Sequence, residues 1–365
     1  MLTRVYIDNF LCFVHFEYRP ERKQLLLGPN GSGKSSLLSA IRNLKQFVKG
    51  DENPFTQSTR TRWQDLPLQV LEIEARLDGQ KYEYRVEFPF ASETREQSVN
   101  LERLTVSGVP VFELANGEIR FFPSNSDQTT AVPFRTSKSA LHLSQLSNLH
   151  VRRFVEWMVS VHCFRIDAYP FAMDESADKQ EQEPDDELEN LAGWYRHLVQ
   201  TYPDDNLRFL NSMKDVLSGF QTLRFAPDID GTLKLWADFI APQTKKVSYA
   251  ISELSEGQRC LLALYMILHF PIAKGHTVFI DEPDNFISLR EIQPWLLATE
   301  EKVEDHKGQL ILVSHHPELL NQWASRHGLR FFREGNGQVR TEKFKTDPDV
   351  GLQPSELIAR GWEDE

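Results

Sequence analysis

The chain has 365 residues, of which 40% are hydrophobic and 26% are charged, and its formal net charge is −12. This length allows a sizeable core and predicts two or three folding units of a globular protein. The acidic balance excludes a surface that is basic throughout, although a local basic patch for nucleic acid stays compatible with it.

The sequence predicts neither a membrane span nor an export signal. The longest apolar stretch, from Cys260 to Ile272, is interrupted by His269 and is too short to cross a bilayer. Asp8 and Asn9 interrupt the N-terminus before an apolar core of signal-peptide length can form. The three cysteines are scattered and show neither a disulfide framework nor a metal spacing. We therefore expect a cytoplasmic protein without a membrane partner.

The N-terminal region predicts strands that lead into a phosphate-binding loop. Residues 2–19 alternate apolar and polar side chains in two runs, which predicts a β-hairpin or a bent strand pair. The apolar run 25–27 then precedes a glycine-rich loop, and residues 34–49 have helical spacing. The candidate nucleotide-binding residues are Gly28, Pro29, Asn30, Gly31, Ser32, Gly33, Lys34, Ser35 and Ser36.

Each residue type in this loop suits a triphosphate. Glycines let successive backbone N–H groups converge on phosphate oxygens at the positive end of the following helix. Lys34 is expected to reach the β- and γ-phosphates and to be catalytic, while Ser35 is expected to ligate Mg²⁺. The pattern predicts an ATP or GTP site, and the bare pattern does not say what the nucleotide is used for.

Residues 68–122 are strand-like and are separated by short turns. Residues 70–77 and 82–88 flank Asp78-Gly79, which predicts a hairpin. Further short strands flank Ser107-Gly108 and Asn116-Gly117. We expect an antiparallel β-meander attached to the nucleotide core.

The pattern becomes helical after residue 136. Residues 138–165 and 188–220 have helical periodicity and predict a helical lobe, and short strands return at 223–225 and 233–239. Between the helical segments, residues 174–190 contain nine acidic residues and one lysine. We expect this acidic insertion to be solvated and mobile, rather than part of the core.

A second anion-binding element precedes the apolar helix that starts near residue 258. Ser255 and Gly257 stand at the helix N-terminus, where a hydroxyl and a backbone N–H favour an anion. The same residues are also compatible with a simple helix N-cap supported by Glu253 or Glu256.

Two buried strands each end in residues with chemical function. Residues 276–280 lead to Asp281 and Glu282, where Asp281 is suited to Mg²⁺ and Glu282 to polarising a water; a solvated turn is the alternative. Residues 309–313 lead to Ser314 and His315, and His315 is suited to donating a hydrogen bond to a γ-phosphate. His316 is a competing candidate, and either ring could instead bond a backbone carbonyl.

Taken in this order, these motifs resemble the Walker A, signature, Walker B and switch-histidine motifs of an ABC-type ATPase. The opening Ile7-Asp8-Asn9-Phe10 resembles the SMC, RecF and OLD branch, and residues 139–268 also resemble the AAA_21-like ATP-binding proteins found in bacterial anti-phage systems. The resemblance implies an α/β fold: a P-loop ABC-ATPase head with an antiparallel β-meander and an inserted helical lobe. The expected divisions are 1–135, 136–250, 251–345 and a tail, 346–365.

The resemblance also implies a composite site that uses ATP and Mg²⁺. Ser255 and Gly257 of one protomer would contact the γ-phosphate on the P-loop of another, which gives a head-to-tail homodimer and allows higher oligomers. Gln145, rather than Gln57, is the candidate for the family's Q-loop glutamine. The sequence departs from the family in Glu256, which replaces a glycine, and near Ser288, where many relatives have a histidine.

The function expected from the resemblance is a Mg²⁺-dependent ATPase whose dimerisation controls a DNA-related or effector activity in phage defence. No heptad pattern for long arms is present, and the tail is too short for a nuclease domain, so a nuclease or toxin effector would be a separate chain. The alternatives are a RecF-type DNA clamp and a transporter ATPase subunit. For the DNA clamp the candidate basic clusters are Arg60 with Arg62, Arg152 with Arg153, and Lys245 with Lys246.

Overall fold

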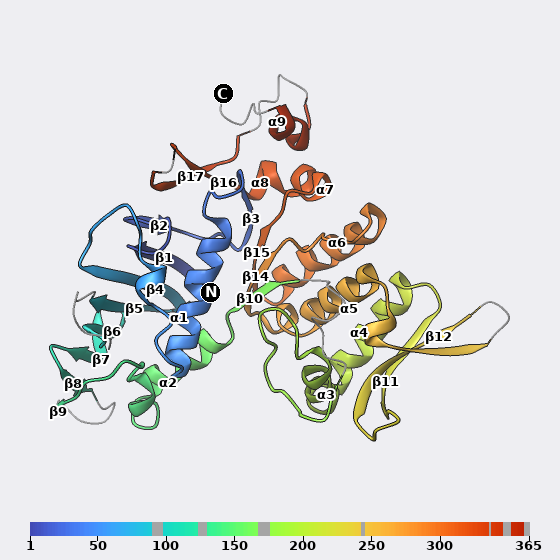
Figure 1. The fold of residues 1–365 in the computed structure, drawn as a ribbon, viewed down its shortest axis with the longest axis horizontal. Coiled ribbons are helices and arrows are strands. Elements are labelled where there is room, and N and C mark those ends of the chain that lie inside the picture. Colours follow the sequence, from blue (N-terminus) through green and yellow to red (C-terminus); the bar gives the residue numbers. More distant parts are fainter. Residues whose placement is uncertain are drawn as a thin grey trace. The chain divides into compact units, whose positions relative to one another are not determined.

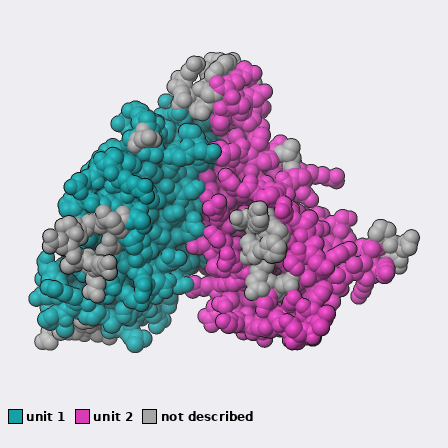
Figure 2. Space-filling view, in the orientation of Figure 1, with its two compact units in different colours: residues 1–162, 324–346 teal, residues 163–323, 347–365 magenta. Residues whose placement is uncertain are grey.

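The computed structural model describes residues 1–89, 98–122, 130–166, 176–241, 245–335, 337–345 and 352–360. Its contacts divide the chain into two compact units (Figures 1 and 2). Unit 1 comprises Met1–His162 and Ala324–Thr346, and unit 2 comprises Cys163–Trp323 and Asp347–Glu365. The start of the acidic insertion, residues 90–97 of the expected meander and most of the tail lie outside the described residues.

The largest element of unit 1 is an eight-stranded antiparallel sheet in the order β2-β1-β4-β5-β6-β7-β8-β9. It contains the expected N-terminal strand pair and the expected meander. Its strands are β1 (Leu2–Asp8), β2 (Phe16–Tyr18), β4 (Leu68–Leu77), β5 (Gln80–Pro89), β6 (Leu101–Val106), β7 (Val109–Ala115), β8 (Glu118–Phe121) and β9 (Thr130–Pro133).

Three tight turns fix the register of the meander. Asp78-Gly79, Ser107-Gly108 and Asn116-Gly117 each have positive φ at both residues. This is the conformation of a type I′ turn, whose twist matches that of the two strands it joins. The Asp-Gly hairpin predicted from the sequence is therefore confirmed, with Leu77 paired to Gln80.

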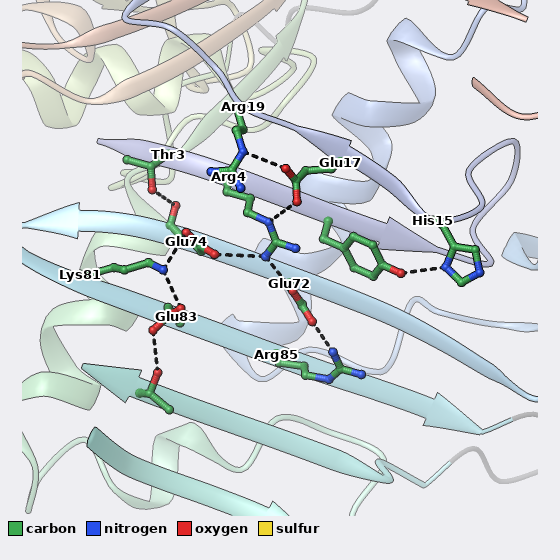
Figure 3. A network of polar contacts seen from close by, with 12 residues as sticks. Thr3, Arg4, His15, Glu17, Arg19, Glu72, Glu74, Lys81, Glu83 and Arg85 are labelled. Carbon is green, nitrogen blue, oxygen red and sulfur yellow. Dashed lines mark hydrogen bonds and ion pairs between the residues drawn. The ribbon is translucent and has the colours of Figure 1, made fainter. Parts of the chain in front are cut away.

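The two faces of this sheet differ because side chains alternate along each strand. On one face, Phe88 of β5 packs against Phe47 of helix α1 (Lys34–Lys49), with 5.1 Å between the ring centroids. Tyr84 packs against Phe154 of α2 (Leu149–Val159), with 5.0 Å between the ring centroids. The other face is charged. There Arg4 contacts Glu17, Glu72 and Glu74, Glu72 also pairs with Arg85, and Lys81 bridges Glu74 and Glu83 (Figure 3).

Unit 1 also contains the strand that leads to the glycine-rich loop. β3 (Lys23–Leu27) pairs in parallel with β16 (Gly328–Arg333). β16 pairs antiparallel with β17 (Val339–Lys343). The remaining short helices of this unit are η1 (Gln57–Thr59), η2 (Leu141–Leu143) and α8 (Ser325–His327).

Unit 2 is built around a buried parallel strand pair and an apolar helix. β14 (Thr277–Asp281) and β15 (Gln309–Val313) pair in parallel and are buried at every position, as is typical of strands covered on both faces. Helix α5 (Glu256–His269) is buried from Arg259 to His269, so it lies within the core of this unit.

The other elements of unit 2 surround that core. A three-stranded antiparallel sheet, β11-β12-β13, contains the two returning strands expected from the sequence. The elements are β10 (His162–Arg165, which starts at the unit boundary), α3 (Leu191–Thr201), α4 (Pro203–Val216), β11 (Phe220–Pro227), β12 (Leu233–Ile240), β13 (Lys246–Ala250), η3 (Ile251–Glu253), η4 (Ile272–Lys274), α6 (Leu289–Asp305), α7 (Pro317–Leu319), η5 (Leu320–Ala324) and α9 (Pro354–Arg360).

The acidic insertion, in its described part 176–190, is largely solvent-accessible as expected, but two of its apolar residues belong to the core. Ala177 and Leu188 are fully buried. The carboxylate of Asp185 accepts hydrogen bonds from the backbone N–H groups of Glu189 and Asn190, at 2.7 and 3.0 Å. Burial of two apolar side chains and capping of the following turn thus hold an acidic segment whose composition alone suggested solvation.

Candidate functional site

The glycine-rich loop of unit 1 has a backbone that requires its glycines. Gly28, Gly31 and Gly33 all have positive φ, at 132°, 79° and 111°. A Cβ atom on Gly28 would lie 2.1 Å from the carbonyl oxygen of Phe331 in β16, so no other residue fits there. The loop therefore runs directly against the neighbouring strand.

Lys34 and Ser32 show how this loop is prepared for an anion. The buried Nζ of Lys34 donates to the carbonyl oxygens of Gly28 and Pro29, at 2.6 and 3.1 Å, so the ammonium group is folded back over the loop. Helix α1 begins after Gly33 without a side-chain cap. The buried hydroxyl of Ser32 has no hydrogen-bond partner within the described residues. An uncapped helix start, an ammonium and an orphan hydroxyl together fit a phosphate group.

In unit 2, β14 ends at the expected carboxylate pair. Asp281 is buried, whereas Glu282 is exposed and has a φ of 51°, which is strained for a residue with a side chain. The backbone N–H of Glu282 donates to the Val313 carbonyl of β15 at 2.8 Å. The Asn285 amide donates to the Glu282 carboxylate at 2.7 Å. The carboxylate is thus oriented by a residue that the sequence interpretation did not single out.

The end of β15 is tied to the same loop through Asp284. The Ser314 hydroxyl donates to the Asp284 carboxylate at 2.6 Å and accepts from the His316 N–H at 2.9 Å. Burial raises the pKa of the Asp284 carboxyl above its usual value. The Nδ1 atom of His316 accepts from the Glu318 N–H at 3.2 Å and so caps α7, whereas His315 is exposed. One ring nitrogen of His316 is therefore used to cap α7.

The signature segment forms an N-cap and also touches the loop after β14. Ser255 is the exposed N-cap of α5: its hydroxyl accepts from the Gln258 N–H, and the Gln258 side chain accepts from the Ser255 N–H. The cap expected from sequence is present, but Gln258 supports it, rather than Glu253 or Glu256. A Cβ on Gly257 would lie 2.7 Å from the Phe286 carbonyl oxygen, so Gly257 allows α5 to approach that loop closely.

Gln145 lies half-buried in the turn between η2 and α2, in the same unit as the glycine-rich loop. The segment that carries it is anchored to the meander by Glu102. This buried carboxyl accepts from the hydroxyls of Tyr84 and Ser139, at 2.7 and 2.5 Å, and from the Ala140 N–H at 2.8 Å. Burial raises the pKa of Glu102 to about 7, although these hydrogen bonds favour its charged form.

Comparison with known proteins assigns the chain to a family. A family model described as "AAA domain, putative AbiEii toxin, Type IV TA system" (AAA_21) matches residues 25–321. The chain belongs to the AAA_21 family. The match spans the glycine-rich loop, both candidate carboxylates and the candidate histidines. No curated protein matches the sequence.

Solved structures show the fold of this AAA_21 chain. A crystal structure of an SMC head bound to the C-winged helix domain of ScpA is 11% identical, with coverage of 96% of this chain and 99% of that chain and a TM-score of 0.56. An SMC head domain from Thermotoga maritima is 14% identical, with coverage of 94% and 99% and a TM-score of 0.48. The expected membership of the AAA_21 family is therefore confirmed, and so is the expected α/β head fold, which is similar to that of an SMC head.

The AAA_21 chain uses Asn9 in a way that the sequence interpretation missed. Asn9 is fully buried, with a φ of 60°. Its amide donates to the carbonyls of Leu66 and Leu68 and accepts from the Thr61 N–H. Asn9 therefore fixes the loop after α1 in place. The only sequence signal was a polar residue between two apolar runs.

Two of the candidate basic clusters are engaged in ion pairs. Arg60 contacts Asp65, Arg152 contacts Glu156, and Arg153 contacts Asp78. Lys245 and Lys246 lie exposed at the start of β13. None of the helices in the described part of the chain is long and apolar enough to cross a membrane.

Proposed function

We propose that the chain is a Mg²⁺-dependent ATP-hydrolysing switch subunit, in which ATP-driven dimerisation controls a separate effector. The observation that carries this proposal is that one AAA_21 chain holds an anion-ready P-loop and an oriented carboxylate at the end of a buried parallel strand. The first element suits binding of the triphosphate, and the second suits attack by water.

Binding is assigned to the P-loop, with Gly28, Pro29, Asn30, Gly31, Ser32, Gly33 and Ser36 forming its cradle. Lys34, which now donates to two loop carbonyls, would turn its ammonium to the β- and γ-phosphates. Ser35 and Asp281 are the proposed Mg²⁺ ligands, since hydroxyl and carboxylate oxygens suit this ion. When held by these residues, the ion would supply positive charge to the phosphate oxygens.

Turnover is assigned to the loops of unit 2. Glu282 would accept a proton from the attacking water, and its hydrogen bond from Asn285 supports that role because it limits the carboxylate's rotation. His315, exposed at the end of β15, would donate to the γ-phosphate. Gln145 is the proposed Q-loop glutamine.

Dimerisation is proposed through Ser255 and Gly257. Helix α1 already presents its N-terminus at the P-loop of its own chain, so the exposed start of α5 is available for the phosphate of another chain. Two nucleotides would then join a head-to-tail homodimer, from which higher oligomers could be built. We propose that residues 1–135, 136–250, 251–345 and 346–365 are the functional segments of the chain.

The proposed role is anti-phage defence in the cytoplasm, with a nuclease or toxin as the separate effector. The toxin–antitoxin wording of the family description supports the defence role, whereas the separate effector is proposed from the resemblance alone. DNA is a proposed further ligand of the assembled switch, rather than of the isolated chain.

The experiment that tests the ATPase switch is light scattering of Glu282→Gln with and without Mg²⁺ and ATP. We expect a monomer that becomes a dimer only with ATP, because binding persists while hydrolysis is blocked. Lys34→Ala should stay monomeric under the same conditions. A Glu282→Gln protein that binds ATP yet remains monomeric would contradict the switch.

A further inference from the structure

We propose that Trp63 is the stacking platform for the base of the nucleotide whose phosphates occupy the P-loop. This inference rests on the proposed ATP binding and adds the part of the site that would recognise the base. Trp63, the P-loop and Arg333 all lie in unit 1.

One guanidinium group joins the indole to the P-loop. Cζ of Arg333 lies over the Trp63 ring, 5.3 Å from its centroid. Nη1 of the same side chain donates to the Gly31 carbonyl at 3.3 Å, and Nε donates to the Gly337 carbonyl at 2.8 Å. Trp63 is thus one side chain away from the loop that would hold the phosphates, close enough for the base of a bound nucleotide to reach it.

The loop that carries Trp63 is held rigidly, although the indole itself is 43% exposed. Thr61, two residues earlier, is buried and donates its hydroxyl to the Phe13 carbonyl, while its N–H is bound by Asn9. Arg60 closes the loop through Asp65, at 2.5 Å, and the Leu66 carbonyl, at 2.7 Å. An exposed tryptophan on an ordered loop loses little conformational freedom when a ligand stacks on it.

The surroundings of Trp63 suit a nucleobase. Residues 60–65 line a hollow of about 480 Å³, and Arg62 in the same hollow is exposed. An indole offers a flat π-face to a base, and a guanidinium can stack on the base or contact the adjacent phosphate. Stacking does not require a base-specific hydrogen bond, so ATP and GTP should both use this platform.

The test compares ATP with inorganic tripolyphosphate, which has no base, in calorimetric binding to the full chain with Mg²⁺. Trp63→Ala should weaken ATP binding by about 5- to 100-fold, the usual worth of one base stack, and leave tripolyphosphate binding unchanged. Trp63→Phe should retain most of the ATP affinity. ATP, but not tripolyphosphate, should change the fluorescence that Trp63 contributes.

The controls separate this proposal from the one it rests on. If Lys34→Ala leaves the affinities for ATP and for tripolyphosphate unchanged, the P-loop assignment is wrong. An unchanged ATP affinity in Trp63→Ala, by contrast, overturns only the stacking platform. An equal loss of affinity for ATP and for tripolyphosphate in Trp63→Ala would also overturn the stacking proposal, since the indole would then act by supporting Arg333 and the loop. A single-stranded oligonucleotide whose binding needs Trp63, while ATP binding does not, would assign the hollow to nucleic acid and contradict the proposal.

Discussion

The glycine-rich loop of unit 1 and the loop after β14 in unit 2 both follow a buried strand, but they are held in shape by different means. The first loop is fixed by backbone packing, since Gly28 lies against the Phe331 carbonyl where no side chain fits. The second is fixed by side chains, since Asn285 and Ser314 hold Glu282 and Asp284. Positive φ falls on glycines in the first loop and on Glu282 and Phe286 in the second.

This difference indicates a division of labour. A loop made of backbone N–H groups and one ammonium offers a fixed positive cradle, which suits binding. In the second loop, the orientation of the carboxylates depends on neighbouring side chains, so a small movement of those side chains changes it. This suits a hydrolysis step that must be controlled. Substitutions in unit 1 should therefore change nucleotide affinity, and substitutions in the loop of unit 2 should change turnover.

The largest effect is expected from Glu282→Gln. Loss of the general base should lower kcat for ATP hydrolysis by about 10²- to 10⁴-fold, while the ATP affinity stays within about threefold. Phosphate release and equilibrium binding measure the two quantities. Glu301→Gln, an exposed change in the same unit, is the matched control. Wild-type turnover in Glu282→Gln would remove Glu282 from the proposed chemistry.

Lys34→Ala tests the proposed role of the glycine-rich loop of unit 1 in nucleotide binding. Removing a charged donor to the phosphates should weaken ATP binding by about 100-fold. Lys138→Ala, an exposed lysine of the same unit, should bind ATP normally. An unchanged affinity in Lys34→Ala would mean that the nucleotide is held elsewhere.

Asn285→Ala should have a smaller effect, confined to turnover. The Glu282 carboxylate would lose one oriented hydrogen bond, and we expect kcat to fall by about tenfold with KM unchanged. A general structural defect would instead alter KM and stability.

The smallest effect on activity is expected at Glu102, which supports the scaffold of unit 1. Its pKa is raised to about 7 in the folded protein, above the unfolded value, so folding takes up a proton between these two pH values. As the pH rises toward 7, the buried carboxyl therefore lowers the free energy of unfolding, by about 3 kcal/mol at most. Urea unfolding at pH 5 and pH 8 should show this loss in the wild type and not in Glu102→Gln. Parallel pH dependence in both proteins would contradict it.

The sequence was sufficient for those parts of the fold that depend on local pattern. The turns at 78–79, 107–108 and 116–117 could be predicted because only residues that tolerate positive φ fit them. The buried strands predicted at 276–280 and 309–313 lie at 277–281 and 309–313, and they could be predicted because strands covered on both faces are mostly apolar. The P-loop could be recognised because its glycines are a steric requirement.

The sequence was insufficient where distant residues fix a side chain. Nothing local predicts that Asn9 holds the loop of Trp63, or that Arg333, some 300 positions from Gly31, donates to its carbonyl. The two buried residues of the acidic insertion, Ala177 and Leu188, could not be predicted, because composition counts charges and does not show which side chains reach the core. Such contacts depend on the tertiary fold, and periodicity carries no information about them.

The central claim is that Ser255 of one chain completes the P-loop of another. The direct measurement is ATP turnover by an equal mixture of Lys34→Ala and Ser255→Arg proteins, each inactive alone. In a mixed dimer, the intact P-loop of the Ser255→Arg chain would meet the intact Ser255 of the Lys34→Ala chain. We predict turnover that appears only on mixing and reaches at most about half of the wild-type turnover, since neither protein dimerises alone and each mixed dimer has one complete site out of two. A mixture as inactive as its two components would contradict the composite site.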